Sequence, residues 1–245
     1  MDSYRSTARW TGIWFILTFV ASIPAALYLY TPVLDHSDYI LGDGADTRIA
    51  FGALLEVITA IANIATAVVL FPVVRRVQES VALGYVASRV LESTVIVVGL
   101  ISLMSVVTLR QDLAGEGSDT GSLNVAGHTL VAIHDWTFLL GPAFCAGLGT
   151  GLLVGYLMYK SQLVPRRMAI VGLVGGSLAL VTATAVLFGA WDQTSGISFL
   201  FTVPEIVWEA FLGIYLTFWG FRPAGVAALD DHEAHIEAAT VPEPA

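Results

Sequence analysis

Charged residues are scarce in this chain, and cysteine is nearly absent. Lys, Arg, Asp and Glu make up only 13% of the 245 residues, whereas hydrophobic residues make up 56%. The mean hydropathy of +0.76 lies well outside the range of soluble globular proteins. Cys145 is the single cysteine, so no intrachain disulfide can form. These shortages exclude both a soluble domain and a scaffold held together by disulfides.

The patterns of several common enzyme classes are also missing. Zinc catalysis usually requires three good ligands, often histidines, but only His128 and His134 lie near an apolar segment, at its edge. The sequence contains no Ser/His/Asp spacing and no phosphate-binding glycine loop. Its formal net charge of -9 argues against a nucleic-acid partner, since phosphate backbones are negative too. No cofactor is indicated, although carboxylate oxygens could hold a hard cation.

Six apolar runs are each long enough to span a lipid bilayer, which takes about 20 residues of helix. Backbone groups in lipid must be satisfied within the segment, and runs of this length without strict alternation predict helices rather than barrel strands. The first run follows two arginines like a signal peptide, but it is too long for one, so we expect it to be retained. The fold class is therefore an all-α bundle of six transmembrane helices, at about 10–30, 49–72, 82–109, 135–158, 168–190 and 202–221.

Basic residues predict the orientation, because short cytoplasmic loops retain Lys and Arg. Only Arg48 and Arg110 fall outside when the N-terminus is placed in the cytoplasm. We therefore expect a multi-pass protein of the cell membrane with both termini cytoplasmic. The tail at 223–245 is rich in Ala, Pro and acid, which predicts a disordered cytoplasmic segment after the membrane domain at 1–222. Eight basic residues lie inside in this arrangement: Arg5, Arg9, Arg75, Arg76, Lys160, Arg166, Arg167 and Arg222.

The fourth and fifth runs carry packing signals. Small residues recur every four positions from Ala143 to Gly155, and Gly172 and Gly176 repeat the spacing. Such stripes let helix backbones approach closely, which predicts tight packing between these two spans or dimerisation through one of them. Pro142 should kink the fourth span. Because residues 123–158 are too many for one untilted span, we also expect a short interfacial helix before a fourth span that begins near Asp135.

Polar side chains form stripes within these apolar spans. A charged side chain at the bilayer centre costs about 2.5–3.5 kcal/mol even on the lenient insertion scale, so the stripes should face the bundle interior. Residues three or four apart share a helix face. The second span places Glu56, Thr59, Asn63 and Thr66 on one face, the third places Tyr85, Arg89 and Glu92, and the sixth places Glu205 and Glu209.

Several of these residues have a purely structural explanation. Arg89 and Glu92 form an i, i+3 pair that could neutralise itself. Glu205 matches a capping box that begins at Thr202, with a proline near the first turn. Asp135 could cap the fourth span, and His134 beside it could be an interfacial histidine with a hydrogen bond.

Glu56 and Glu209 have no such local explanation. With Glu92 they place three acids against Arg89, an excess of two negative charges that protons or a bound cation must neutralise. From the helical rise we estimate Glu56 at ~7 Å and Glu209 at ~3 Å outside the midplane, and Glu92 at ~6 Å inside it. The predicted arrangement is a ladder across the membrane rather than one compact cluster.

Three stretches resemble a bacterial membrane family labelled domain of unknown function 4386, which has six spans. They are LFPVVRRVQESVALGYVASRVLES (70–93), LGPAFCAGLGTGLLVGYLMYKSQLVPRRMAIVGLVGG (140–176) and PEIVWEAFLGIYLTFWGF (204–221). The resemblance implies that the family's third-span Arg-x-x-Glu corresponds to Arg89 and Glu92, and that its sixth-span Glu after a Pro corresponds to Glu209. Glu205 departs from the family pattern, where an apolar residue is usual. The family has no assigned activity.

Three functions are consistent with the sequence. The favoured hypothesis is a small transporter, or a proton- or cation-coupled protein that binds a small ligand, and a homodimer would suit so short a carrier. Its proton or cation sites would be Glu56, Glu92 and Glu209, with Arg89 as counter-ion and with supporting polar groups on Asn63, Tyr85, His134 and Asp135. The alternative is a membrane-embedded, metal-assisted hydrolase acting on lipid. The third is a structural or regulatory membrane protein whose buried charges set helix register.

Overall fold

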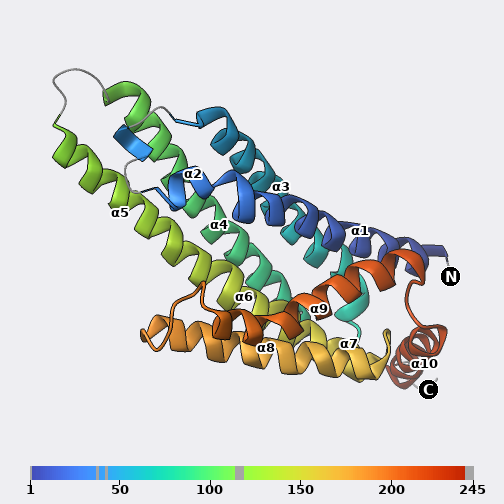
Figure 1. Ribbon diagram of the computed structural model, residues 1–245. Coiled ribbons are helices and arrows are strands. Elements are labelled where there is room, and N and C mark those ends of the chain that lie inside the picture. The colour runs from blue at the N-terminus through green and yellow to red at the C-terminus, as the bar shows by residue number, and fades with distance from the viewer. Residues whose placement is uncertain (1, 37–38, 42–43, 114–118, 241–245) are drawn as a thin grey trace.

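The protein is an all-α polytopic membrane protein, as the sequence predicts. The structure, a computed structural model, describes residues 2–36, 39–41, 44–113 and 119–240, and within these residues it contains helices and no strand (Figure 1). Six helices are long and apolar enough to cross a membrane.

The six spans are α1 with the π-helical segment η1, then α3, α4, a composite helix running from α5 to α7, α8 and α9. Short helices α2 and η2 connect the first two spans, and α10 follows the last. Their bounds are α1 Asp2–Pro24, η1 Ala25–Leu29, α2 Thr31–Leu34, η2 Tyr39–Leu41, α3 Asp46–Val74, α4 Glu79–Leu113, α5 Thr120–Phe138, η3 Leu139–Ala143, α6 Phe144–Ala146, η4 Gly147–Val154, α7 Gly155–Ser161, α8 Arg166–Leu187, α9 Gly196–Phe218 and α10 Pro223–Thr240.

The spans pack as a ring that follows the order of the chain. α3 packs on α4, α4 packs on the composite helix, this helix packs on α8, and α8 packs on α9. α1 closes the ring because it contacts both α3 and α9. All six spans can therefore present residues to one interior. Figure 1 shows both termini at one end of the bundle, and α3, α4 and α5 extending beyond α8 and α9 at the other end.

The fourth span differs from its prediction. Instead of an interfacial helix followed by a span beginning near Asp135, helical chain is continuous from Thr120 to Ser161. Asp119 caps this helix by accepting a hydrogen bond from the Gly121 amide at 3.1 Å. The capping prediction for Asp135 is therefore wrong, because this residue lies about four turns after the start of the continuous helix. The predicted disturbance at Pro142 takes the form of the π-helical η3, which accommodates the missing amide donor.

The small-residue stripes bring the composite helix and α8 together. A Cβ atom added to Gly176 would lie 2.5 Å from the Gly147 carbonyl oxygen and 2.8 Å from Gly151 Cα. A Cβ atom on Gly155 would come within 3.2 Å of the Leu173 amide nitrogen. Backbone thus contacts backbone over two turns. Of the two outcomes that the stripes predicted, the structure shows packing between the fourth and fifth spans.

The sixth span begins earlier than expected. α9 starts at Gly196, where the Ser195 side chain accepts a hydrogen bond from the Ser198 amide. Glu205 lies nearly three turns inside this helix and only 3% of its surface is exposed. The capping-box prediction for Glu205 is therefore wrong.

The segment after residue 222 also differs from expectation, because Pro223–Thr240 forms helix α10 rather than disordered chain. Leu229 is buried against the bundle core. Asp230 forms an ion pair with Arg76 at 2.8 Å and accepts a hydrogen bond from the Tyr4 hydroxyl at 2.6 Å. These contacts explain why an Ala-rich, acidic sequence is ordered here: the end of the bundle supplies a partner. The last five residues of the predicted tail, 241–245, lie outside the described residues.

Candidate functional site

Arg89 is the centre of a buried polar cluster. Its residue is 2% exposed, and its guanidinium donates through Nη1 to Glu92 Oε2 at 2.7 Å and through Nη2 to Glu209 Oε1 at 2.8 Å. Nη2 also donates to the Thr150 hydroxyl, and Nη1 lies 3.4 Å from Asn63 Oδ1. One side chain of α4 thereby contacts α3, η4 and α9.

Two predicted supporting residues hold this cluster in position. Asn63 donates from Nδ2 to Glu92 Oε1 at 3.0 Å, so both oxygens of Glu92 are paired. Tyr85 is fully buried, its hydroxyl lies 2.9 Å from Thr66 Oγ1, and its ring centre is 5.8 Å from the Arg89 guanidinium carbon. α3 and α4 therefore present the polar faces that helical periodicity predicts.

Thr150 and Trp208 belong to the site, although the sequence did not single them out. Thr150 accepts from Arg89 through its hydroxyl, and its backbone carbonyl accepts a 2.9 Å hydrogen bond from Trp208 Nε1. Both residues are fully buried. The only available signals were a lone hydroxyl in the Gly-rich run GLGTGLL and a tryptophan next to Glu209. Neither pattern is distinctive in an apolar span.

The predicted ladder of separate charges is not what the structure contains. Arg89 forms ion pairs with both Glu92 and Glu209, so the three residues form one compact cluster. The depth estimate treated each span as straight and parallel to the membrane normal. Because the helices are inclined and these side chains are long, the charged groups meet although their estimated depths differ by a few ångströms. Only Glu56 remains apart.

Glu56 belongs to a second group, two turns along α3 from Asn63. It accepts a 2.9 Å hydrogen bond from the Tyr30 hydroxyl. The Tyr30 ring meets the ring of the buried His134 edge to face at 5.9 Å. Asp135 lies 3.6 Å from His134 Nδ1, but 64% of its side chain is exposed. Glu56 and His134 thus both contact Tyr30, whereas the side chain of Asp135 is exposed at the surface.

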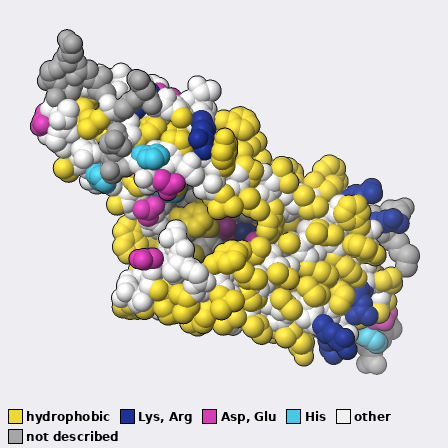
Figure 2. All heavy atoms as spheres, viewed as in Figure 1, with side chains coloured by type: hydrophobic (Ala, Val, Ile, Leu, Met, Phe, Trp, Pro, Cys, Tyr) yellow, Lys and Arg dark blue, Asp and Glu magenta, His cyan; other side chains and the backbone are white. Residues whose placement is uncertain are grey.

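A hollow reaches into the middle of the molecule. Figure 2 shows it on the face in view, with acidic and basic side chains on its floor. Within the cluster, the side chain of Glu209 is 17% exposed, compared with 5% for Glu92 and 2% for Arg89. Glu209 is therefore the most exposed of these three side chains.

Glu205 adds a third carboxyl next to the cluster. It lies one turn before Glu209 on α9, and neither of its side-chain oxygens has a hydrogen-bond partner among the described residues. Glu92, Glu205 and Glu209 then face the single positive charge of Arg89. If all three were ionised, the group would carry two excess negative charges, which is costly at this burial. The arrangement therefore favours a positively charged ligand, including protons.

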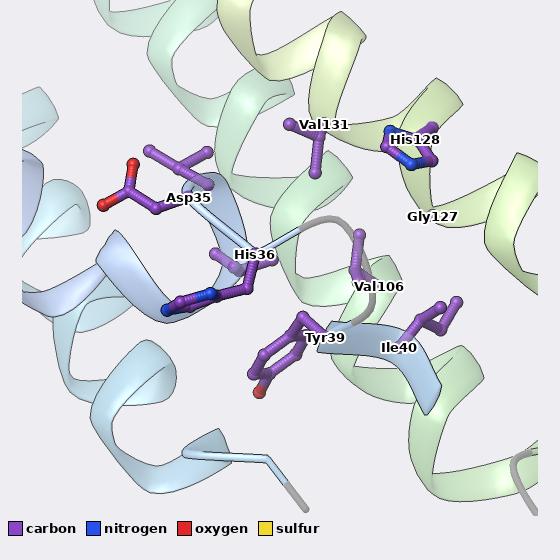
Figure 3. A pocket seen from close by; sticks show the side chains of 10 residues that line it. Asp35, His36, Tyr39, Ile40, Val106, Gly127, His128 and Val131 are labelled. Carbon is purple, nitrogen blue, oxygen red and sulfur yellow. The ribbon is translucent and has the colours of Figure 1, made fainter. Parts of the chain in front are cut away.

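A pocket lies away from this cluster, at the end of the bundle opposite the termini. It encloses about 160 Å³ between α2, η2, α4 and α5, and Figure 3 shows His36 and His128 on opposite sides of it. Tyr39 lines the pocket and donates to Asp46 at 2.7 Å, and burial together with this bond raises the pKa of Tyr39. None of the predicted site residues lines this pocket, so we do not assign the function to it.

No group of three or more His, Cys, Asp or Glu side chains is placed to hold a metal ion in the part of the chain that the structure describes. The carboxylates of the cluster are arranged around a guanidinium instead.

Comparisons with known proteins agree with the resemblance seen in the sequence. The family described as domain of unknown function (DUF4386) matches residues 10–220, which include most of the first span and the other five spans to the end of α9. No curated protein and no solved structure matches the chain. Because the match extends over most of the sequence, the chain belongs to the DUF4386 family.

Proposed function

We propose that the protein is a small transporter, or a proton- or cation-coupled membrane protein that binds a small ligand, with its site at Arg89, Glu92 and Glu209. One observation carries this proposal: a buried guanidinium forms ion pairs with two carboxylates from different helices, and the carboxylate on α9 is partly exposed. Buried intramembrane charges usually mark substrate or ion pathways.

The charges favour a cationic ligand. The guanidinium of Arg89 already donates to two carboxylates and a hydroxyl, so an anion would have to displace these partners. A cation would instead meet the partly exposed carboxylate of Glu209. The rings of Phe15 and Tyr85 lie 5.7 and 5.8 Å from the guanidinium carbon, and aromatic faces at this distance attract cations. In this proposal Arg89 is the internal counter-ion that a ligand replaces at Glu209.

Glu56 would form a second binding site for the cation or proton. It is half-buried, it accepts one hydrogen bond from Tyr30, and it lies two turns from the central cluster on the same face of α3. His134 supplies a titratable neighbour across the Tyr30 ring. A cation or proton could then pass between two carboxylate sites within the ring of helices.

The location and orientation belong to the same proposal. We expect the protein in the cell membrane with both termini in the cytoplasm, since the basic residues favour this by eight to two. The two termini lie at one end of the bundle, where Lys and Arg side chains gather in Figure 2. A homodimer in the bilayer would fit a carrier of only six spans.

The alternatives make different demands on the same residues. A metal-assisted lipid hydrolase would place a hard cation on the carboxylates and would turn over lipid. A structural role would require the Arg89 cluster only to hold α4 against α9. No specific contact favours either one, so both serve as outcomes of the experiment below.

The test is cation-driven proton movement in liposomes that contain the purified full chain and a trapped pH dye. Na⁺, K⁺, methylammonium and tetramethylammonium are each added outside. For at least one of them we expect a signal that Glu209→Gln and Glu92→Gln lower by about tenfold or more, because one lost charge-assisted contact exceeds ~1.4 kcal/mol. Glu79→Gln is the matched control, since Glu79 is exposed at the start of α4.

Two further readouts separate the alternatives. Both variants should remain inserted and monodisperse in detergent. If they move protons and cations like the parent protein, the proposal fails. Loss of folding in both variants would indicate a structural role, and loss of hydrolysis of an added phospholipid would indicate an enzyme.

A further inference from the structure

Glu205 and Glu92 are the two most buried carboxyls in the described part of the spans, and the capping role that the sequence suggested for Glu205 does not apply. It lies in the middle of α9 with 3% of its surface exposed. Both carboxyl oxygens are buried and lack a hydrogen-bond partner among the described residues. An ionised carboxylate without a partner costs several kcal/mol at such burial.

Glycines of two neighbouring helices pack closely against Glu205. A Cβ atom on Gly151 would lie 2.6 Å from Glu205 Oε2, and a Cβ atom on Gly175 would lie 2.6 Å from the Glu205 amide nitrogen. Gly151 comes from the π-helical η4 and Gly175 comes from α8. The carboxyl thus packs against Gly151, and the α9 backbone at Glu205 packs against Gly175. This glycine niche exists only because both positions lack a side chain.

The niche suits a proton better than a metal ion. Hard cations such as Ca²⁺ take about six to eight oxygen ligands, whereas close backbone contact here leaves little room around one carboxyl. A proton needs a single oxygen lone pair and no added space. Glu205 in its neutral form also removes one of the two excess negative charges of the cluster.

The charged groups that face Glu205 come from two helices. On α9, Glu209 is one turn away, and on α4 the neighbours are Arg89 and Glu92, which interact with Glu205 electrostatically. α8 has no ionisable residue after Arg167, and η4 contributes none. Glu209 is the closest of these in sequence and is itself bonded to Arg89. A change in the charge of Glu209 therefore alters the balance between the neutral and the ionised form of Glu205.

We infer that Glu205 is the proton-binding carboxyl of this site, and that it exchanges its proton for a cation bound at Glu209. A cation at Glu209 adds one positive charge one turn away, which favours the ionised form of Glu205. The O–H bond of Glu205 then breaks, the proton passes to water, and the electron pair stays on the carboxylate. By linkage, protonation of Glu205 weakens cation binding by the same factor. The exchange step rests on the proposed function, whereas the protonation of Glu205 does not.

Infrared spectroscopy of the purified full chain at neutral pH tests the protonated state. The parent protein should show a C=O stretching band of a buried carboxylic acid. Glu205→Gln should lack this band, and Glu79→Gln should retain it. Because Gln resembles a neutral Glu, Glu205→Gln should also fold. An identical band in Glu205→Gln and the parent protein, or no such band in the parent, would overturn the inference.

Gly151→Ala provides a second variant that leaves the carboxyl in place. The new Cβ would lie 2.4 Å from Gly176 Cα and 2.6 Å from Glu205 Oε2, so the contact between η4 and α8 must open around the carboxyl. The band should therefore shift in frequency, while Glu79→Gln leaves it unchanged. An unshifted band in Gly151→Ala would contradict the glycine niche. The infrared result is independent of transport. A Glu205 band without cation-driven proton movement therefore refutes only the proposed function, and movement without the band refutes only the inference.

Discussion

At the scale of single residues, Arg89 joins more parts of the protein than any neighbour in the cluster. Its guanidinium contacts Glu92 on its own helix, Glu209 on α9 and the Thr150 hydroxyl on η4. In a medium of low dielectric such charge-assisted bonds are strong, and their loss leaves charges without partners. Arg89 therefore has two tasks, to neutralise the carboxylates and to hold the helices around them.

Removal of this charge should destabilise the protein. Arg89→Gln leaves Glu92 and Glu209 without a cation, and breaking a buried pair in this way typically costs about 3–5 kcal/mol. We expect the low end of this range, since Glu209 is partly exposed. Thermal denaturation in detergent would show a lower melting temperature, with the exposed Arg5→Gln as control.

Neutralising a partner tests the cause of that loss. Arg89→Gln combined with Glu92→Gln should recover part of the stability, because one unpaired charge is gone. If the double variant is less stable than Arg89→Gln alone, repulsion between unpaired carboxylates is not the reason for the loss.

The sequence predicted the charged members of this site but assigned one of them incorrectly. Arg89, Glu92 and Glu209 were found because ionisable residues are rare in apolar spans. Glu205 was taken for a cap because Thr202, Pro204 and Glu205 imitate a helix start. The true cap, Ser195, lies in a short polar stretch that could equally have been loop. What the sequence could not supply was the distance between helices, which is why Thr150 was missed.

At the scale of elements, the contact between the composite helix and α8 shapes the site. Gly147 and Gly151 on η4 meet Gly176 on α8 with backbone against backbone. The same approach creates the niche of Glu205 and places Thr150 beside Arg89. η4 is π-helical over eight residues, and such segments occur frequently at functional sites.

A single methyl group should disturb this contact. In Gly176→Ala the new Cβ would lie 2.5 Å from the Gly147 carbonyl oxygen, so the helices must separate. Overpacking of this kind costs about 1–3 kcal/mol, which should lower the melting temperature. Gly196→Ala is the matched control, because a Cβ there meets no atom within 4 Å. Equal melting temperatures for the two variants would contradict the close approach of η4 and α8.

Helix packing was predictable from small-residue spacing, but two other features of the elements were not. The π-helical turns depend on how the backbone relaxes around Pro142 and the glycines, which periodicity does not report. The order of α10 depends on Arg76 and Tyr4, which are distant in sequence from the tail they contact. Local composition therefore predicted disorder where a tertiary contact imposes a helix.

At the scale of the whole molecule, six spans form a ring in chain order around an interior that holds the Arg89 cluster among mainly hydrophobic side chains. The number of spans and the all-α class followed from composition and run length alone, since the bilayer allows few other solutions. The hollow did not follow from the sequence, because it arises from the arrangement of helices in space. Acidic and basic side chains lie on its floor (Figure 2).

Proton release on cation binding tests the central claim most directly. The purified full chain is titrated at neutral pH, in weakly buffered detergent solution, with the same four cations, and the released protons are counted. We predict that at least one cation releases about one proton per chain from the parent protein and from Glu79→Gln. Glu209→Gln, which loses the cation site, and Glu205→Gln, which loses the proton site, should release none. Equal release from all four proteins, or no release from the parent with any of the cations, would contradict the account.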